Sequence, residues 1–332
     1  MNITLETAQA HLDALAKPKG SLGRLETLAA RLAVIQQSLK PQTRPRRIVL
    51  FAGDHGVAAS GVTAWPSAVT GAMIGLICAG RASSCALASA QGADLRLVDM
   101  GSLSSTPNPP VFFRDARIAP GTADLSCGAA MTVDQFEQAW SVGEEEARRA
   151  HAEDFRVLIA GEMGIGNTTA AACLTMLFAG TDASTATGRG AGADDAILAR
   201  KCAIVEAATN SARSLDGSTA VAAIAGFEIA AMAGYFAQAA QQGSTILLDG
   251  YVTTAAALVA EHFRPGTSAQ MIAAHLSAEP GHRAALNALA LEPLLQWDMR
   301  LGEGTGALTA LPLLDSAAAL FADVALLADI AP

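Results

Sequence analysis

The spacing of apolar residues predicts helices at both ends of the chain and a different pattern between them. Within residues 1–44, apolar side chains recur every three or four positions, which is the period of an amphipathic helix, and a turn over residues 17–21 interrupts the run. Residues 305–328 are predicted to be helical as well. Because neither end carries a predicted strand, we expect residues 1–44 and 305–332 to form a small helical domain beside a larger domain over residues 45–304.

Between the two ends, short apolar runs alternate with Ala-rich helical stretches. Apolar strands that alternate with helices are typical of a parallel sheet covered on both faces, so we predict an α/β fold of Rossmann-like type. In such folds, ligands gather beyond the carboxyl ends of the strands. The predicted strands are residues 47–54, 95–101, 156–162 and 245–250, with residues 271–277 as a candidate fifth. The predicted helices are residues 67–91, 134–152, 168–180, 192–214, 221–240 and 252–263.

The composition excludes several classes of protein. The chain has 332 residues, 51% apolar and 16% charged, which is too apolar for an intrinsically disordered protein. The five cysteines are scattered without a CxxC pair and no targeting segment is visible, so we expect a cytoplasmic location. A net charge of −9 argues against a nucleic-acid partner. Residues 221–237 are apolar but carry Glu228 and are shorter than the ~20 residues of a membrane span, so we expect a buried helix and no membrane partner.

Two glycine-rich segments are candidate anion sites. Residues 161–169 (GEMGIGNTT) follow a predicted strand and open a helix, where glycines allow close approach and free N–H groups face an anion such as phosphate. Residues 188–195 (GRGAGADD) lead into another helix, and Asp194 and Asp195 suit its first turn. Neither segment has the ending of a P-loop, and a plain strand-to-helix turn remains the alternative for the first.

A third glycine-rich segment carries the strongest candidate for acid–base chemistry. In residues 300–307 (RLGEGTGA), Glu303 stands between glycines that leave its carboxylate unshielded and let the backbone present it. A carboxylate that a bound substrate partly desolvates is suited to accept a proton near neutral pH. The alternative is an acid that caps the C-terminal helix.

Other polar clusters are less specific. His275, Glu279 and His282 are potential metal ligands, but the intervening Pro-Gly pair prevents helical ligand geometry, so we predict no metal. Asp54 and His55 at a strand end are either an acid–base pair or, as we favour, residues that organise the loop. The chain has no GxSxG elbow and no recognisable Cys/His nucleophile pair. Glycine-rich anion sites with isolated carboxylates fit group transfer on a phosphorylated sugar.

Taken together, the motifs resemble those of the nicotinate-nucleotide–dimethylbenzimidazole phosphoribosyltransferase family of cobalamin biosynthesis. The likeness extends in order from residue 17 to residue 306, and seven ordered motifs are far more specific than one. The chain departs from the family pattern at Ala191, where a threonine is usual, and at Ala225-Gly226, where a Gly-Gly pair is usual. The matching segments are residues 17–26 (KPKGSLGRLE), 51–57 (FAGDHGV), 161–169, 188–190, 226–234 (GFEIAAMAG), 277–282 (SAEPGH) and 300–306.

The resemblance implies a homodimeric enzyme that needs no metal or redox cofactor. Its substrates would be nicotinate mononucleotide and 5,6-dimethylbenzimidazole, and its products α-ribazole 5′-phosphate and nicotinate. It places the catalytic glutamate at Glu303, and Trp65 and Met73 in the segment that lines the pocket for the base, which we expect to be a flat apolar slot. It assigns nucleotide binding to Glu162, Gly164, Gly190, Lys201, Asp249, Ser277, Gly302 and Gly304.

Two other classes remain open at this level. A nicotinamide-dependent oxidoreductase would carry GxGxxG near its first strand, and residues 53–56 (GDHG) do not fit that pattern. A non-catalytic nucleotide-binding or regulatory protein of the same fold would keep the glycine segments but would have no use for Glu303.

Overall fold

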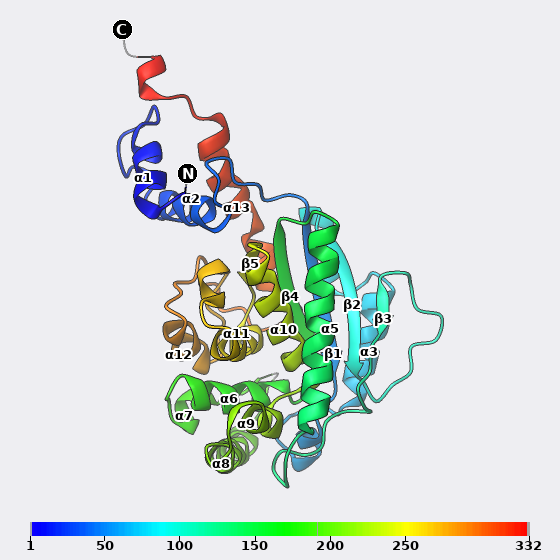
Figure 1. The fold of residues 1–332 in the computed structure, drawn as a ribbon. Helices are drawn as coiled ribbons and strands as arrows, with labels where there is room; N and C mark the ends of the chain where they lie inside the picture. The colour runs from blue at the N-terminus through cyan, green and yellow to red at the C-terminus, as the bar shows by residue number, and fades with distance from the viewer. Residues whose placement is uncertain (1, 191, 331–332) are drawn as a thin grey trace.

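The computed structural model, which describes residues 2–190 and 192–330, is a parallel sheet with helices on both faces (Figure 1). Among the described residues the sheet has six strands: β1 (Arg46–Gly53), β2 (Asp94–Gly101), β3 (Phe113–Asp115), β4 (Val157–Met163), β5 (Thr245–Leu248) and β6 (Met271–Ala273). They pair in the order β3-β2-β1-β4-β5-β6, and every pair is parallel. The predicted α/β fold is therefore confirmed. The strand order reverses between β1 and β4, and ligands bind beyond the carboxyl ends of the strands at such a reversal.

Each face of the sheet has its own apolar core, because successive side chains of a strand point to opposite sides. In β1, Val49 and Phe51 belong to one core, and Ile48 and Leu50 belong to the other. The first core is covered by α5 (Val133–Ala152), α6 (Asn167–Phe178), α7 (Ala183–Ala186), α8 (Asp195–Ala212), α9 (Gly217–Ile224), α10 (Phe227–Gln241), α11 (Tyr251–Phe263) and α12 (Gly281–Ala288). The second is covered by α1 (Leu5–Asp13), α2 (Arg24–Ile35), α3 (Ala68–Cys78), α4 (Ser83–Gln91) and α13 (Thr305–Asp323).

The predicted helices exist, but two of them are divided. The stretch 67–91 breaks at Gly80, whose φ of +69° ends the turn after α3. The stretch 221–240 breaks where extended Ala225 separates α9 from α10, and the stretch 192–214 is occupied by α8 alone, with the short α7 before it. The candidate fifth strand is confirmed as the short β6. Strand β3 and helix α12 are additional to the elements predicted from the sequence.

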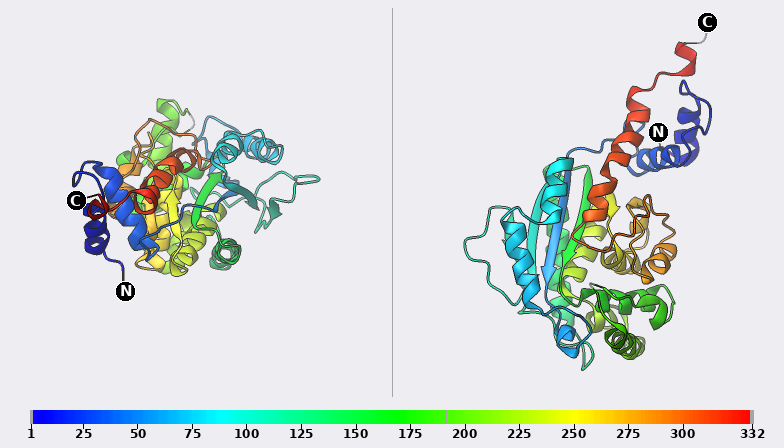
Figure 2. Two further views of the ribbon diagram at one scale, coloured as in Figure 1. Left: turned by 90° about the horizontal axis from the view of Figure 1, so that it is seen from above. Right: turned by 180° about the vertical axis from the view of Figure 1, so that it is seen from behind.

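The two ends of the chain lie side by side at one end of the molecule (Figure 2). Helix α2 packs against α1 and α13, and the backbone joins the ends directly, since Ala16 N–H donates to Ala325 O at 2.8 Å and Leu327 N–H donates to Ala14 O at 2.8 Å. Their apolar side chains continue into the core beneath Ile48. The division into a small helical domain and a larger domain stays a proposal.

In the part of the chain that the structure describes, two helical stretches are long and apolar enough to cross a membrane when judged by length and composition alone. Both have a mean hydropathy of 1.4. Thr305–Asp323 coincides with α13, which is 61% buried and packs on the sheet, so the core of the protein accounts for its apolar character. Ala68–Gln91 spans α3 and α4 and is only 28% buried, which leaves an apolar surface on the outside of the molecule.

Candidate active site

A cavity of about 280 Å³ opens beyond the carboxyl ends of β4, β5 and β6, next to the point where the strand order reverses. Of the residues predicted from sequence, the cavity is lined by Trp65, Met73, Glu162, Gly164, Gly190, Asp249, Ser277, Gly302 and Glu303. Lys201 and Gly304 lie behind this lining. The structure therefore gathers segments that lie far apart in the sequence around one cavity, although it does not by itself test their roles.

Glu303 is presented by a left-handed stretch of backbone. Gly302, Glu303 and Gly304 have φ values of +85°, +56° and +71°, a region that side chains other than glycine rarely adopt. A Cβ at Gly302 would displace Glu162 Oε1 and one at Gly304 would displace Ile48 Cδ1, and the positive φ at both positions favours glycine as well. The Glu303 side chain is buried and accepts a hydrogen bond from Ser84 Oγ, which lies 2.9 Å from Oε2.

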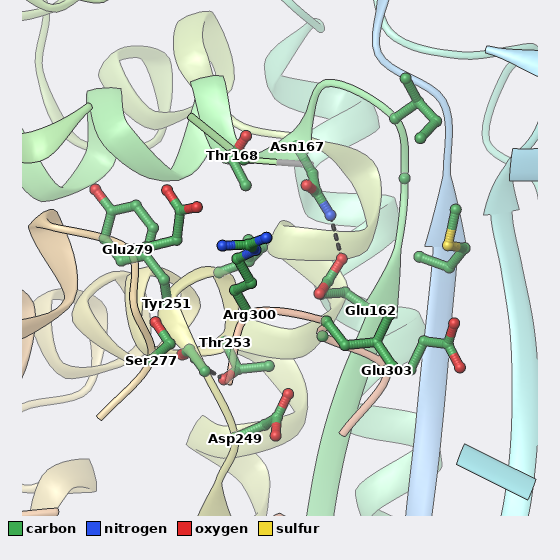
Figure 3. A pocket seen from close by; sticks show the side chains of 18 of the residues that line it. Glu162, Asn167, Thr168, Asp249, Tyr251, Thr253, Ser277, Glu279, Arg300 and Glu303 are labelled. Carbon is green, nitrogen blue, oxygen red and sulfur yellow. Dashed lines mark hydrogen bonds between the residues drawn. The ribbon is translucent and has the colours of Figure 1, made fainter. Parts of the chain in front are cut away.

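Glu162 stands at the end of β4, and its carboxylate accepts a hydrogen bond from Asn167 Nδ2 at the start of α6. The carboxylates of Glu162 and Glu303 point away from each other, and that of Glu162 points toward Asn167 (Figure 3). Burial, together with the negative charges of Asp249 and Glu228, raises the pKa of Glu162 to about 8. Glu162 is therefore mostly protonated at neutral pH when the cavity is empty.

Asp249 follows β5 and caps the helix that begins after the Glu303 loop. Its Oδ2 accepts from Gly304 N–H at 3.1 Å and its Oδ1 accepts from Ala307 N–H at 3.0 Å, which satisfies free donors at the start of α13. Asp249 and Gly304 thus fix the position of the Glu303 loop relative to the sheet. The carboxylate of Asp249 also lines the cavity.

Lys201 lies in α8, where only 1% of its surface is exposed. Its Nζ donates to Thr168 Oγ1 at 2.7 Å and to Gly188 O at 3.2 Å, so it ties the first glycine segment to the second. Burial lowers the pKa of Lys201 to about 8, although the nearby carboxylate of Glu279 acts in the opposite direction. Thr168, Gly190 and Glu279 line the cavity in front of this ammonium group.

Ser277 belongs to a chain of hydrogen bonds that fixes the proton of His282. Ser277 N–H donates to His282 Nδ1 at 2.9 Å, and the Thr254 hydroxyl donates to Gly250 O at 2.8 Å. The Thr254 oxygen, 2.9 Å from His282 Nε2, therefore accepts from that nitrogen. Burial, with His275 and Arg283 nearby, lowers the pKa of His282 to about 3, so the ring is neutral.

The structure does not assemble a metal site from the candidate ligands His275, Glu279 and His282. Both ring nitrogens of His282 are engaged in the hydrogen bonds just described. Within residues 2–190 and 192–330, no three histidine, cysteine, aspartate or glutamate side chains are grouped so that they could hold a metal ion. A reaction without a metal stays a prediction.

Asp54 and His55 have partners that the sequence did not reveal. His55 Nε2 lies 2.6 Å from Glu228 Oε1, and both side chains are buried. Asp54 Oδ2 accepts from Leu103 N–H at 2.8 Å. A Cβ at Gly164 would lie 3.4 Å from His55 Cδ2, so the imidazole packs against the glycine turn after β4. These contacts support the interpretation that Asp54 and His55 organise loops.

Trp65 and Met73 lie at the outer side of the cavity. Trp65 precedes α3 and is 51% exposed, whereas Met73 is half-buried within that helix. Arg300, Thr168, Asn167, Tyr251 and Thr253 also line the cavity but had no binding role assigned from the sequence, and Glu279, which also lines it, had been considered only as a metal ligand (Figure 3). Arg300 stood at the start of a recognised motif, and Thr168 and Asn167 stood within another, whereas nothing in the sequence pointed to Tyr251. Ala191 lies outside the described residues.

A parallel sheet of this order, with glycine-rich turns and buried charges around a cavity at its reversal point, defines an α/β enzyme that binds a nucleotide. Comparison with known sequences identifies the family within this class. The profile of the phosphoribosyltransferase family DBI_PRT matches residues 2–330, and the chain belongs to this family.

Individual relatives agree with this assignment over almost the whole chain. The chain is 43% identical over 319 residues to nicotinate-nucleotide–dimethylbenzimidazole phosphoribosyltransferase of Azotobacter vinelandii, covering 96% of this chain and 91% of that one. It is 42% identical over 332 residues to the enzyme of the same name from Pseudomonas putida, covering 99% and 94%. The crystal structure of CobT from Thermus thermophilus superimposes with a TM-score of 0.92 at 41% identity, covering 96% of each chain. The family resemblance of the motifs is confirmed, and the chain is an enzyme of the pentosyltransferase class.

Proposed function

We propose that this chain transfers the 5-phosphoribosyl group of nicotinate mononucleotide to 5,6-dimethylbenzimidazole, releasing nicotinate and α-ribazole 5′-phosphate. The names of its relatives support this reaction. The observation that supports this reaction most is the carboxylate of Glu303, which lines the cavity from a left-handed loop. Buried acids lie on one side of this cavity, and the buried Lys201 lies behind its other side. A regulatory protein of the same fold would have no need to keep a glutamate at so unfavourable a backbone position.

The chemistry needs one proton acceptor and no general acid. The free imidazole nitrogen of the base attacks C1′ from the face opposite nicotinate, and the breaking C1′–N bond returns its electron pair to the pyridine nitrogen. The transition state resembles an oxocarbenium ion, and attack from the opposite face inverts the β linkage to α. The product would carry a positive charge unless the N–H proton of the second imidazole nitrogen is removed. In our proposal Glu303 accepts that proton.

The predicted nucleotide-binding residues divide between the two ends of the ligand. Gly190 and Ser277, with the ammonium of Lys201 behind Thr168, suit the 5′-phosphate. Glu162 lies where the pyridinium and the developing oxocarbenium charge would be, and a cation there favours its ionised form. Gly164 and Gly302 line the part of the cavity that we assign to the sugar, and Asp249 and Gly304 hold the Glu303 loop in place. Much of the rate would then come from orientation.

Trp65 and Met73 are proposed to line the slot for the base. A flat aromatic face and a flexible thioether bind planar rings through contact area and dispersion. Such a slot accepts several benzimidazoles, because one methyl group in an apolar pocket contributes only about 1–3 kcal/mol.

We also propose that the chain forms a homodimer in the cytoplasm, without nucleic-acid or membrane partners. The exposed side of α3 supports the dimer, since Ala68, Ala72, Gly75, Leu76 and Ala79 recur at helical spacing and present a small, apolar face. A second copy of the same helix could pack closely on this face. Sedimentation of the wild type as a dimer and of Leu76→Glu as a monomer is the expected result, and a monomeric wild type would contradict the proposal.

The reaction is tested by incubating the purified chain with both substrates and following nicotinate and the ribosylated base by chromatography. We expect the two products in equal amounts, with an α linkage by NMR. The control omits the base, which should leave nicotinate mononucleotide intact. Binding of the nucleotide without any product would favour the regulatory alternative instead.

A further inference from the structure

Ser84 makes an unexpected contact for a residue of an Ala-rich helix. It lies in the first turn of α4, has no exposed surface, and is separated from Glu303 by 219 positions in the chain. Its Oγ lies 2.9 Å from Glu303 Oε2. The Ser84 hydroxyl donates this hydrogen bond to the carboxylate.

Both partners of this contact are fixed by packing. Helix α4 packs against α13, and the Glu303 loop leads directly into α13 through Gly304. Serine at the start of a helix commonly caps the backbone or bonds to a nearby carbonyl. No side-chain cap is formed at the start of α4, and Ser84 turns instead toward the carboxylate.

The geometry of Glu303 explains why such a contact is needed. Its neighbours on both sides are glycines, so no adjacent side chain restricts the torsions of the glutamate. A hydrogen bond from Ser84 to Oε2 selects one orientation of the Glu303 carboxylate, in which Oε1 can accept a proton. Positioning of a reactive group by a supporting hydrogen bond is a general requirement of catalytic sites.

We propose that Ser84 is a positioning residue for Glu303, which holds one carboxylate oxygen so that the other faces the incoming base. This inference rests on the proposed function, in which Glu303 is the general base. The experiment must therefore distinguish rejection of the proposed role of Ser84 from rejection of the proposed role of Glu303.

The primary variant is Ser84→Ala, with Ser83→Ala as the matched control, because Ser83 is the adjacent serine of the same helix but is exposed. We expect Ser84→Ala to lower kcat by about 10- to 100-fold, the range for a hydrogen bond to a charged group. The dissociation constant for nicotinate mononucleotide should stay unchanged. The acid-side limb of kcat should move to higher pH, because the lost hydrogen bond favoured the charged form. Ser83→Ala should behave as wild type.

Two further variants complete the test. Ser84→Cys keeps the size of the side chain with a weaker donor, so its kcat should fall between those of wild type and Ser84→Ala. In a Glu303→Gln background, Ser84→Ala should cause no additional loss, since both residues act through one carboxylate.

Several outcomes would overturn the proposal. Unchanged kcat and pH profile in Ser84→Ala, with Glu303→Gln inactive, would reject the role of Ser84 and leave the proposed function standing. Additive losses in the double variant, or unfolding of both the alanine and cysteine variants, would show that Ser84 serves only the fold. Full activity of Glu303→Gln would instead reject the general base itself.

Discussion

Burial shifts pKa values in opposite directions at the two ends of the cavity. At the carboxylate end, which we define by Glu162 and Glu303, burial raises the pKa of Glu162 to about 8. At the cation end, defined by Lys201 with Thr168 and Gly190, burial lowers the pKa of Lys201 to about 8. Both buried groups are thus pushed toward their neutral forms while the cavity is empty. A ligand with a cationic ring and an anionic phosphate would favour the charged form of the ionisable group at each end.

We expect the largest effect when the proposed general base is removed from the carboxylate end. Glu303→Gln keeps the size and one hydrogen-bond acceptor but accepts no proton, so kcat should fall by about 10²–10⁴-fold. Binding of nicotinate mononucleotide should be nearly unchanged, because the nucleotide contacts lie elsewhere in the cavity. Steady-state kinetics and calorimetry measure the two quantities. A variant with normal turnover would remove Glu303 from the mechanism.

The cation end should show the reverse pattern. Lys201→Met preserves an apolar stem of similar length in a buried site and removes the ammonium group. Loss of the positive charge behind the proposed phosphate position should weaken binding of nicotinate mononucleotide by about 10- to 100-fold. Nicotinate riboside, which has no phosphate, is the control ligand and should bind the variant and the wild type alike. Equal losses for both ligands would show that Lys201 supports only the fold.

A substitution beside the carboxylate end should affect the base and not the nucleotide. Met73→Ala should change the relative kcat/KM values for benzimidazole, 5-methylbenzimidazole and the dimethyl compound by up to about 10-fold per methyl group. The KM for nicotinate mononucleotide should not move. If the ranking and size of the three values are the same as in the wild type, Met73 is an ordinary core residue.

The same shifts in pKa should also appear in stability as a function of pH. Glu162 has an ordinary pKa of 4.5, so between pH 4.5 and about 8 the unfolded chain binds fewer protons and its contribution lowers the free energy of unfolding as pH rises. Lys201 has an ordinary pKa of 10.5, so between about 8 and 10.5 the unfolded chain binds more protons and its contribution rises with pH. Urea unfolding of Glu162→Gln and Lys201→Met should flatten the first and the second slope respectively. Curves parallel to the wild type would contradict the shifted pKa values.

Periodicity predicted the layers of this fold but not how they are divided. The apolar strands and Ala-rich helices were visible because a doubly covered sheet needs both. A three-residue edge strand such as β3 has too few positions to show a pattern. The breaks at Gly80 and Ala225 were hidden because the helices on both sides of each break are rich in small and apolar residues. The strand order depends on contacts between distant segments, which periodicity does not contain.

The candidate site shows the same limit at the level of single residues. Glu162 and Glu303 could be found because each glutamate stands next to glycines. Ser84 and Glu228 could not be paired with their partners, because each is a polar residue within a helix whose partner lies in a distant segment. The family motifs brought together most of the cavity lining, but motifs indicate which segments matter and not which atoms meet.

The left-handed backbone at Glu303 lowers the stability of the fold but serves the proposed function. A residue with a side chain at such a φ costs about 1–2 kcal/mol relative to glycine, so glycine at position 303 would relieve strain that the enzyme tolerates for the sake of its carboxylate. Selection for heat resistance alone would therefore favour loss of this glutamate, and only a selection that also rewards turnover would retain it.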